Sequence, residues 1–393
     1  MFLAKAADKI VLNILNKIDY GYLELTTYDG KIFKFGDPSH YLKANLIINN
    51  PNFNYNLIKS GSVGLAECYM RNEFQTANLS NLIELTARNI KLIHKFAGIL
   101  DIPVINFVKN KIIKNTKNRS KENISKHYDL GNEFFSLWLD ETLTYSSAIF
   151  DDEKKKLSDA QNNKYQKLVD LINPNHGDKV LEIGCGWGGF AEFAAKNYNS
   201  LVTSITISKE QFEFTKKRIE KNGLNKSIDV KLIDYRKIKG SFDRIISIEM
   251  IEAVGEKYWP IYFNQIKKLL KPNGNAAIQV ITIDDKYFND YKKFPDFIQK
   301  YIFPGGMLPS ISALEKPIQQ SGLKIDKIDS FGKDYASTLS IWSKQFNSAW
   351  PKISKLGFDN RFHRMWNLYF SYCEGGFKSG SIDVKQIKLS PVN

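Results

Sequence analysis

Three glycines with the spacing G-x-G-x-G stand near the middle of the chain, at Gly184, Gly186 and Gly188. The short apolar run 179–183 before them predicts a buried strand, and residues 190–196 after them predict a helix. Glycines let the backbone approach a ligand closely, and the start of a helix offers free N–H groups. This order of strand, turn and helix therefore predicts a site for a nucleotide-like ligand, either a dinucleotide or S-adenosylmethionine.

The ends of the next two predicted strands help to distinguish between these ligands. In dinucleotide enzymes the second strand usually ends in an acid that holds the ribose. Here the strand 201–207 has no acid at its tip, and the third strand instead ends at Asp234 and Tyr235. A carboxylate there can hold an adenine amino group, and the ring can pack on the base. Together with residues 270–274, these ends favour a methyl donor over a hydride carrier.

Strands and helices alternate from about residue 121 onward, and they must position these groups. Apolar runs predict strands at 179–183, 201–207, 228–234, 242–248 and 276–283, and helical patterns separate them at 190–196, 211–222 and 259–270. Parallel strands need such crossover connections. The alternation therefore predicts an α/β fold with a doubly wound, mostly parallel sheet.

The first 105 residues predict a smaller mixed domain. Alternating patterns at 22–28 and 31–35 flank the turn residues Asp29 and Gly30, which predicts a β-hairpin, and residues 79–88 follow a helical pattern. Residues 109–121 then carry several lysines and no acid. We interpret the segment 106–122 as a basic linker between two domains.

The composition excludes several classes of protein. The chain of 393 residues is long enough for two domains, and it holds no apolar run of about 18 residues that would predict a transmembrane helix. The three cysteines lie far apart, which disfavours a disulfide framework and favours a reducing cytoplasm. The five histidines show no spacing typical of metal ligands, so we expect no metal site.

The net charge of +14 favours an anionic partner. This partner could be nucleic acid or an anionic membrane surface. The basic residues are not organised around a nucleic-acid recognition motif, so we expect no nucleic-acid binding. An ordinary solvated surface rich in lysine would also explain part of the charge.

Further motifs surround the glycine turn, and together they resemble those of a known protein family. They are His127–Phe135, Leu143–Ala148, Thr206–Gln211, Glu252–Gly255, Lys300–Gly306, Phe331–Tyr335 and Tyr372–Phe377. With these motifs, residues 124–390 resemble the cyclopropane-fatty-acyl-phospholipid synthases and their relatives, the mycolic acid cyclopropane synthases. The first hundred residues are similar more loosely. The resemblance implies a seven-stranded, Rossmann-like methyltransferase sheet in a catalytic domain over 123–393, and a small lipid- or membrane-associated domain over 1–105.

The resemblance also implies a reaction. The family transfers the sulfonium methyl group of S-adenosylmethionine to a cis double bond in an acyl chain of a membrane phospholipid. Loss of a proton from the new methyl group then closes a cyclopropane ring. An alkene is a weak nucleophile, so it must be held close to the methyl group, and the carbocation must be kept from water. The family uses a bound bicarbonate ion as the base.

The resemblance places the bicarbonate pocket on Ser147, Glu252, Gln279, the backbone of Ile281, and Tyr335. Two of these residues depart from the family, which often has cysteine at the position of Ser147 and histidine at that of Gln279. Both replacements keep hydrogen-bonding groups, so Glu252 and Tyr335 could still help to hold the ion. They also leave room for a methyl-branched or methylene product.

The same resemblance assigns a second set of residues to the methyl donor, S-adenosylmethionine. In this set Gln211 replaces the missing acid on the ribose hydroxyls. The full set is Tyr145, Ser146, Gly184, Cys185, Gly186, Gly188, Thr206, Gln211, Asp234 and Tyr235.

These expectations describe a cytoplasmic enzyme that is peripherally bound to the inner face of the membrane. Its partners would be unsaturated phospholipid and the anionic membrane surface, and the family often forms homodimers. One alternative is a methyltransferase of the same fold that makes another lipid product. A second is a lipid-binding homologue without catalytic activity.

Overall fold

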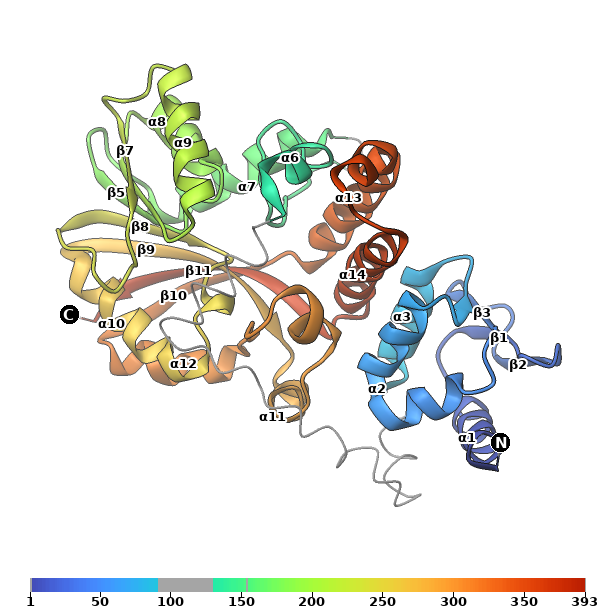
Figure 1. Ribbon diagram of the computed structural model, residues 1–393. Helices are drawn as coiled ribbons and strands as arrows, with labels where there is room; N and C mark the ends of the chain where they lie inside the picture. Colours follow the sequence, from blue (N-terminus) through green and yellow to red (C-terminus); the bar gives the residue numbers. More distant parts are fainter. Residues whose placement is uncertain (1, 91–129, 153–154, 393) are drawn as a thin grey trace. The chain divides into compact units, whose positions relative to one another are not determined.

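The computed structural model describes residues 2–90, 130–152 and 155–392, which form two compact units (Figure 1). One unit combines residues 2–90 with Asp290–Ile302 and Trp342–Ser381. The other contains the described residues between 130 and 289 together with Phe303–Ile341 and residues 382–392. The basic linker expected at 106–122 lies outside the described residues, so the predicted domain boundaries stay a prediction.

A four-stranded sheet forms part of the first unit. Its order is β2-β1-β3-β4, and its strands are β1 (Tyr22–Thr26), β2 (Ile32–Gly36), β3 (Lys43–Ile48) and β4 (Phe74–Gln75). β1 pairs antiparallel with β2, which confirms the predicted hairpin, and it pairs in parallel with β3. Gly30 in the hairpin turn has a φ of +81°, a conformation that glycine adopts readily.

Helices from both ends of the chain complete the first unit. They include α1 (Phe2–Leu15), α2 (Phe53–Met70), α3 (Leu79–Arg88) and α14 (Asn360–Ser379), with a π-helical turn η3 (Ile298–Ile302) and a short helix η4 (Ser354–Leu356). α14 packs against α2 and α3. A Cβ atom at Gly375 would lie 2.8 Å from the backbone nitrogen of Glu84, so α14 needs glycine where it meets α3. This close packing explains why a C-terminal helix belongs to the unit of the N-terminal residues.

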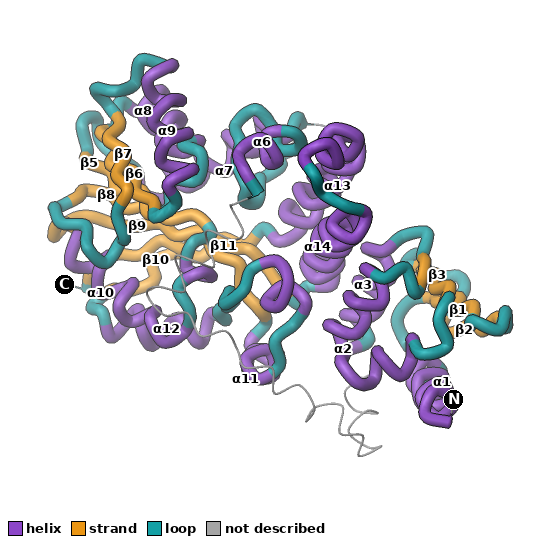
Figure 2. The backbone as a smooth tube through the Cα atoms, viewed as in Figure 1, coloured by secondary structure: helices purple, strands orange, loops and turns teal. Residues whose placement is uncertain are grey.

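The second unit is built on a seven-stranded sheet of order β10-β11-β9-β8-β5-β6-β7 (Figure 2). Its strands are β5 (Lys179–Ile183), β6 (Leu201–Thr206), β7 (Ile228–Leu232), β8 (Phe242–Ile248), β9 (Leu270–Ile283), β10 (Leu323–Ser330) and β11 (Ile382–Pro391). Strands β5 to β9 pair in parallel, and β11 is antiparallel to both β9 and β10. The predicted doubly wound, mostly parallel sheet of seven strands is confirmed.

Helices cover both faces of this sheet. The helices of this unit include α6 (Gly131–Ser136), α7 (Leu157–Ile172), α8 (Gly189–Tyr198), α9 (Lys209–Lys221), α10 (Trp259–Leu269) and α12 (Ile311–Gln320). α11 (Asp285–Lys293) and α13 (Gly332–Ile353) each begin in this unit and end in the first one. Two short helices, η1 (Ile251–Ala253) and η2 (Glu256–Tyr258), follow β8. The helices predicted after the first, second and fourth strands are therefore present as α8, α9 and α10.

Alternate residues of the central strands belong to two separate cores. Val180 of β5 and Ile246 of β8 pack with α7 and α8, whereas Leu181 and Ile245 pack with α10 and α12. Successive side chains of a strand point to opposite faces, so apolar residues in sequence fill both cores. This is why the central strands appear in the sequence as continuous runs of apolar residues.

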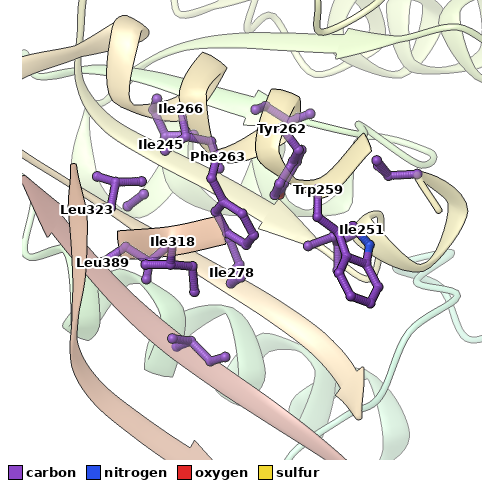
Figure 3. Packing of buried hydrophobic residues seen from close by; sticks show 14 of the residues in the cluster. Ile245, Ile251, Trp259, Tyr262, Phe263, Ile266, Ile278, Ile318, Leu323 and Leu389 are labelled. Carbon is purple, nitrogen blue, oxygen red and sulfur yellow. The ribbon is translucent and has the colours of Figure 1, made fainter. Parts of the chain in front are cut away.

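The core on the α10 face is drawn in Figure 3. Phe263 and Ile266 of α10 lie there with Ile278 of β9, Ile318 of α12 and Leu323 of β10 (Figure 3). Each of these side chains is almost fully removed from water, and such burial contributes about 1.5–3 kcal/mol per large apolar side chain. The core thus fixes the strand ends from which the site residues extend.

One strand is longer than the sequence pattern predicts. β9 begins at Leu270, whereas the apolar run predicted this strand only from residue 276, so residues 271–274 also belong to the strand. Leu270 lies opposite Phe242, and the register of the pair then shifts, which accommodates the extra residues. The ammonium group of Lys271 also bonds the carboxylate of Asp243 at 2.7 Å.

A transmembrane helix would need a long apolar segment, and among residues 2–90, 130–152 and 155–392 no helix has the length and hydrophobicity to cross a bilayer.

Candidate active site

A cavity of about 190 Å³ opens at the carboxyl ends of β5, β6, β7 and β8. Ligands in open α/β sheets bind at this edge, where the loops after the strands converge. Every residue that we expected to hold the methyl donor lines the cavity except Gly188. The nine lining residues are Tyr145, Ser146, Gly184, Cys185, Gly186, Thr206, Gln211, Asp234 and Tyr235.

The glycine turn has the backbone conformation that its residues predict. Gly184, Gly186 and Gly188 have φ values of +94°, +50° and +83°, which side chains other than glycine adopt at a cost. The turn is held to β6, because the N–H groups of Gly184 and Cys185 both donate to the carbonyl of Ile205 at 3.0 Å. The turn is therefore a rigid edge of the cavity.

Gly188 lies just before α8 and has a packing role. A Cβ atom at Gly188 would come within 2.7 Å of the side chain of Thr215 on α9. Cys185 is also a packing residue, since it is 3% exposed and burial raises the pKa of its thiol to about 12. A thiol with such a pKa is not ionised near neutral pH, so it is no nucleophile.

The polar residues expected at the ribose and the adenine lie at the carboxyl end of β6, in the first turn of α9 and just after β7. The hydroxyl of Thr206 donates to the side-chain oxygen of Gln211 at 2.9 Å, and this orients the amide at the start of α9. Asp234 forms a hydrogen-bonded ion pair with Arg236. Burial acts to raise the pKa of Asp234, but the bonds from Arg236 leave it below its usual value. Asp234 is thus a carboxylate, and its oxygens can accept a hydrogen bond from an amino group.

Tyr145 and Ser146 lie on the loop before α7. The ring of Tyr145 packs against Phe135 and Trp138, with centroids 5.4 and 5.7 Å away. The ammonium group of Lys164 donates to the hydroxyl of Ser146 at 2.7 Å. Lys164 is fully buried, and the loss of water lowers its pKa to about 7. A buried lysine whose charge changes near neutral pH therefore lies next to the cavity, and no local pattern in the sequence indicates it.

Glu249 is the centre of a hydrogen-bond cluster that the sequence analysis did not anticipate. One carboxylate oxygen of Glu249 accepts from the backbone N–H of Ser147 at 2.9 Å and from the side-chain amide of Gln279 at 2.8 Å. The other oxygen accepts from the hydroxyl of Tyr335 at 2.8 Å. Three residues expected to bind bicarbonate are therefore brought together, and they all bond the carboxylate of Glu249.

The orientation of two of these donors is fixed by further bonds. The amide of Gln386 on β11 donates to the side-chain oxygen of Gln279 at 3.1 Å, so the NH₂ group of Gln279 faces Glu249. The hydroxyl of Ser147 donates to the carbonyl of Ala148 at 2.9 Å. Ser147 therefore serves Glu249 through its backbone and not through the side chain from which we predicted its role.

Glu252 and Ile281 form a separate pair. The backbone N–H of Ile281 donates to one carboxyl oxygen of Glu252 at 2.6 Å. The other oxygen is buried and has no hydrogen-bond partner within the described ranges. Loss of water, and then the charge of Glu249, raise the pKa of Glu252 to about 8. Glu252 is therefore mostly protonated at neutral pH, whereas the three donors to Glu249 and the nearby Lys164 favour the charged form of Glu249.

Strained backbone is concentrated at the cavity. Apart from asparagines, the non-glycine residues with positive φ in the described chain are Leu143 at +53° and Glu249 at +47°. Both line the cavity. Such conformations cost about 1–3 kcal/mol, and they persist where the surrounding structure holds a functional group in place.

The bicarbonate ion that the resemblance implies would have to use the donors that surround Glu249. The three donors converge on Glu249, and a second anion there would be repelled by its charge. Of the other two residues expected around bicarbonate, Ile281 offers no free donor, because its N–H already donates to the carboxyl group of Glu252. The described residues therefore do not fit a bound bicarbonate.

A signal in the sequence could have identified Glu249. It is the residue that directly follows β8, at the carboxyl edge of the sheet, where catalytic groups are common. The family resemblance instead indicated Glu252, three residues further on. His127 of the motif His127–Phe135 lies outside the described residues, so its position stays open.

Comparison with protein families agrees with the fold and the motifs. The family model described as "Mycolic acid cyclopropane synthetase" matches residues 115–387. The "Tuberculostearic acid methyltransferase UfaA1" of Mycobacterium tuberculosis is 35% identical over 93% of this chain and 87% of its own length. The "Cyclopropane-fatty-acyl-phospholipid synthase" of Escherichia coli is 34% identical over 88% of each chain.

Solved structures of similar fold include two that are related in sequence. The cyclopropane synthase MmaA2 from Mycobacterium tuberculosis superimposes with a TM-score of 0.65 at 29% identity, covering 68% of this chain and 97% of that one. The mycolic acid cyclopropane synthase CmaA1, solved in complex with SAH and CTAB, gives a TM-score of 0.64 at 28% identity with the same coverage.

Proposed function

The chain belongs to the mycolic acid cyclopropane synthetase family of S-adenosylmethionine-dependent methyltransferases, and on this premise we propose that it methylates a cis double bond in an unsaturated acyl chain of a membrane phospholipid. The product in this proposal is a cyclopropane fatty acid. S-adenosylmethionine supplies an electrophilic methyl group, and all other tasks fall to residues of the chain.

One observation carries the proposal: a single cavity is lined both by the glycine turn and by the carboxylate of Glu249. The glycine turn suits the donor, and a carboxylate suits the loss of a proton that must follow methyl transfer to an alkene. A methyltransferase acting on an oxygen or nitrogen nucleophile would not need a proton acceptor for a C–H group.

Aromatic side chains beside the donor residues suit the charge that develops on the acyl chain. Tyr145 and Trp187 line the cavity, and Phe135 packs between them with centroids 5.4 and 4.9 Å away. The faces of such rings attract a cation, whereas bulk water would add to it. In the proposed reaction these rings therefore protect the carbocation until it loses a proton.

The positive net charge supports a membrane surface as the place of reaction. At +14 the chain is attracted to anionic headgroups, with about 1 kcal/mol for each basic residue near the surface. We place the enzyme at the inner face of the membrane, with the N-terminal domain as its lipid-associated part. Homodimer formation remains part of the proposal.

A second lipid product is favoured by one comparison. The relative named as a tuberculostearic acid methyltransferase is 35% identical over 93% of this chain. A 1,2-hydride shift would move the positive charge to the methylated carbon, and loss of a proton from the new methyl group would then give a methylene branch. This route needs no reductant, so it is the alternative product of the same site.

The test combines purified protein, S-adenosylmethionine and vesicles of unsaturated phospholipid. Mass spectrometry should detect lipids heavier by one methylene unit. NMR of these lipids should show the protons of a cyclopropane ring and not those of an exocyclic methylene group. Vesicles with anionic headgroups should react faster at low salt than neutral vesicles. Absence of any heavier lipid from all unsaturated vesicles would reject the proposed substrate.

A further inference from the structure

We propose that the carboxylate of Glu249 is the built-in proton acceptor of this enzyme, in the place where the family resemblance implies a bicarbonate ion. The inference rests on the proposed function and names the base of that reaction. A carboxylate and a bicarbonate have the same charge and the same planar pair of oxygens. The donors that suit one therefore suit the other.

The hydrogen bonds give the first argument. The N–H of Ser147, the amide of Gln279 and the hydroxyl of Tyr335 all donate to Glu249, at distances from 2.8 to 2.9 Å. These are three of the five residues that we expected around bicarbonate. Glu249 lines the cavity, and none of its three donors does. The carboxylate thus stands between its donors and the space where the reacting groups must meet.

The backbone gives the second argument. Glu249 has a φ of +47°, which is costly for a residue with a long side chain. Its own N–H donates to the carbonyl of Gln279 at 2.8 Å, so the strained residue is tied to β9 at two points. Nothing in the packing of β8 requires a carboxylate here. A glycine would relieve the strain, and the presence of glutamate indicates a use for its side chain.

The neighbouring charges give the third argument. Glu249 interacts with the buried ammonium of Lys164, which favours the carboxylate form. Burial raises the pKa of Glu249 above its usual value despite this cation and the three donors, so its basicity is increased. Glu252 holds its proton at neutral pH, so it does not compete with Glu249 as a base. Of the two carboxyl groups, Glu249 is therefore the one able to accept a proton.

Methyl transfer and ring closure conserve all atoms and electrons in the proposed step. The π electrons of the alkene form the bond to the methyl carbon, and the bond from sulfur to that carbon breaks with its electron pair left on sulfur. The acyl chain then carries the positive charge. Glu249 takes a proton from the new methyl group, and the released C–H electrons close the ring onto the cationic carbon. The proton on Glu249 leaves to solvent after the product departs, so no oxidant or reductant is needed.

The first experiment measures turnover with and without bicarbonate. Wild-type enzyme in buffer freed of carbon dioxide should keep its full rate. Glu249→Gln keeps the size of the side chain but cannot accept a proton, so its rate should fall by about 100-fold or more whether bicarbonate is present or not. Glu315→Gln on the exposed face of α12 is the matched control and should retain the wild-type rate. A wild-type enzyme that needs added bicarbonate, or a Glu249→Gln enzyme within about tenfold of wild type, would overturn the proposal.

A second variant asks whether an external anion can replace the side chain. Glu249→Gly removes the carboxylate and suits the positive φ, so the fold should be kept. The three donors are then left for a small anion. Added bicarbonate or formate should restore the rate of this variant by about tenfold or more, and neither should affect Glu249→Gln.

A binding measurement separates this inference from the proposed substrate. We would record the NMR signal of ¹³C-bicarbonate with each protein in the presence of S-adenosylhomocysteine. The signal should broaden with Glu249→Gly and not with wild type. This result is independent of any lipid, so it would stand even if no vesicle were methylated. Specific binding of bicarbonate by the wild-type protein would overturn the inference while leaving the methyltransferase proposal intact.

Discussion

The hydroxyl of Tyr335, at the start of α13, donates a 2.8 Å hydrogen bond to the carboxylate of Glu249, which directly follows β8. The two residues are 86 positions apart in the sequence. Tyr335 is 5% exposed, so the bond lies away from bulk water, where a bond to a charged group is strong. Through this bond α13, which comes late in the sequence, stabilises the charged form of Glu249 at the edge of the cavity.

Replacing Tyr335→Phe removes this donor and keeps the ring. A hydrogen bond to a charged group contributes about 1.5–3 kcal/mol, so we expect kcat to fall by about 10- to 100-fold. The bond stabilises the ionised form, so its loss should also raise the pKa of Glu249 and move the acidic limb of the pH–rate profile to higher pH. The profile of kcat against pH for both enzymes checks this. An unchanged acidic limb would contradict the role of Tyr335 at Glu249.

Ser147→Ala is expected to have little effect. The hydroxyl of Ser147 bonds the carbonyl of Ala148, and Glu249 is served by the backbone N–H, which the substitution retains. We therefore expect kcat/KM to stay within about threefold of wild type, since the lost bond is between neutral groups. Steady-state kinetics of this variant beside Tyr335→Phe make the comparison. A loss as large as that of Tyr335→Phe would show that the side chain of Ser147 takes part.

Alanine at two glycines of the turn should affect two different properties. A methyl group at Gly186 meets no atom within 4 Å, but this residue lines the cavity, so Gly186→Ala should weaken binding of S-adenosylmethionine. Gly188 does not line the cavity, and a methyl group there meets Thr215 at 2.7 Å. Gly188→Ala should thus lower the free energy of unfolding by about 2 kcal/mol, from strain and overlap together.

Calorimetric titration with S-adenosylmethionine and denaturant unfolding would measure both properties for both variants. Equal losses of affinity and of stability in the two variants would contradict this division of roles.

The buried carboxyl group of Glu182 should make the free energy of unfolding depend on pH. This residue of β5 is 2% exposed, and burial raises the pKa of its carboxyl from 4.5 to about 8. The folded state then holds a proton that the unfolded state has lost between these two pH values. The contribution of Glu182 to stability is therefore full below pH 4.5 and is lost as the pH rises to about 8, by about 1 kcal/mol per pH unit.

Glu182→Gln cannot lose a proton, so this part of the dependence should vanish. Unfolding free energies at pH 5, 6 and 7 would give the slope for the variant, the wild type and the exposed control Glu315→Gln. The wild type and the control should lose more stability with rising pH than Glu182→Gln does. Parallel slopes for all three proteins would contradict a protonated Glu182.

Local patterns were enough to predict most of the large sheet. The strands at 179–183 and 242–248 have the predicted bounds, because buried apolar runs and the turns after them depend on neighbouring residues alone. Long-range pairing could not be read in the same way. β9 starts earlier than expected since its first residues pair with the start of β8, and α14 joins the unit of the N-terminal residues through its contact with α3.

The sequence by itself determined the family, the class of fold and the cradle for the methyl donor, since the glycine turn needs only adjacent residues to take its shape. Only the tertiary structure decided which carboxylate is charged at the cavity. The donors to Glu249 come from positions 102, 30 and 86 residues away, and no local pattern records that they meet. Burial and the electrostatic interactions among Glu249, Glu252 and Lys164 then determine which group holds a proton. These effects exist only once the chain has folded.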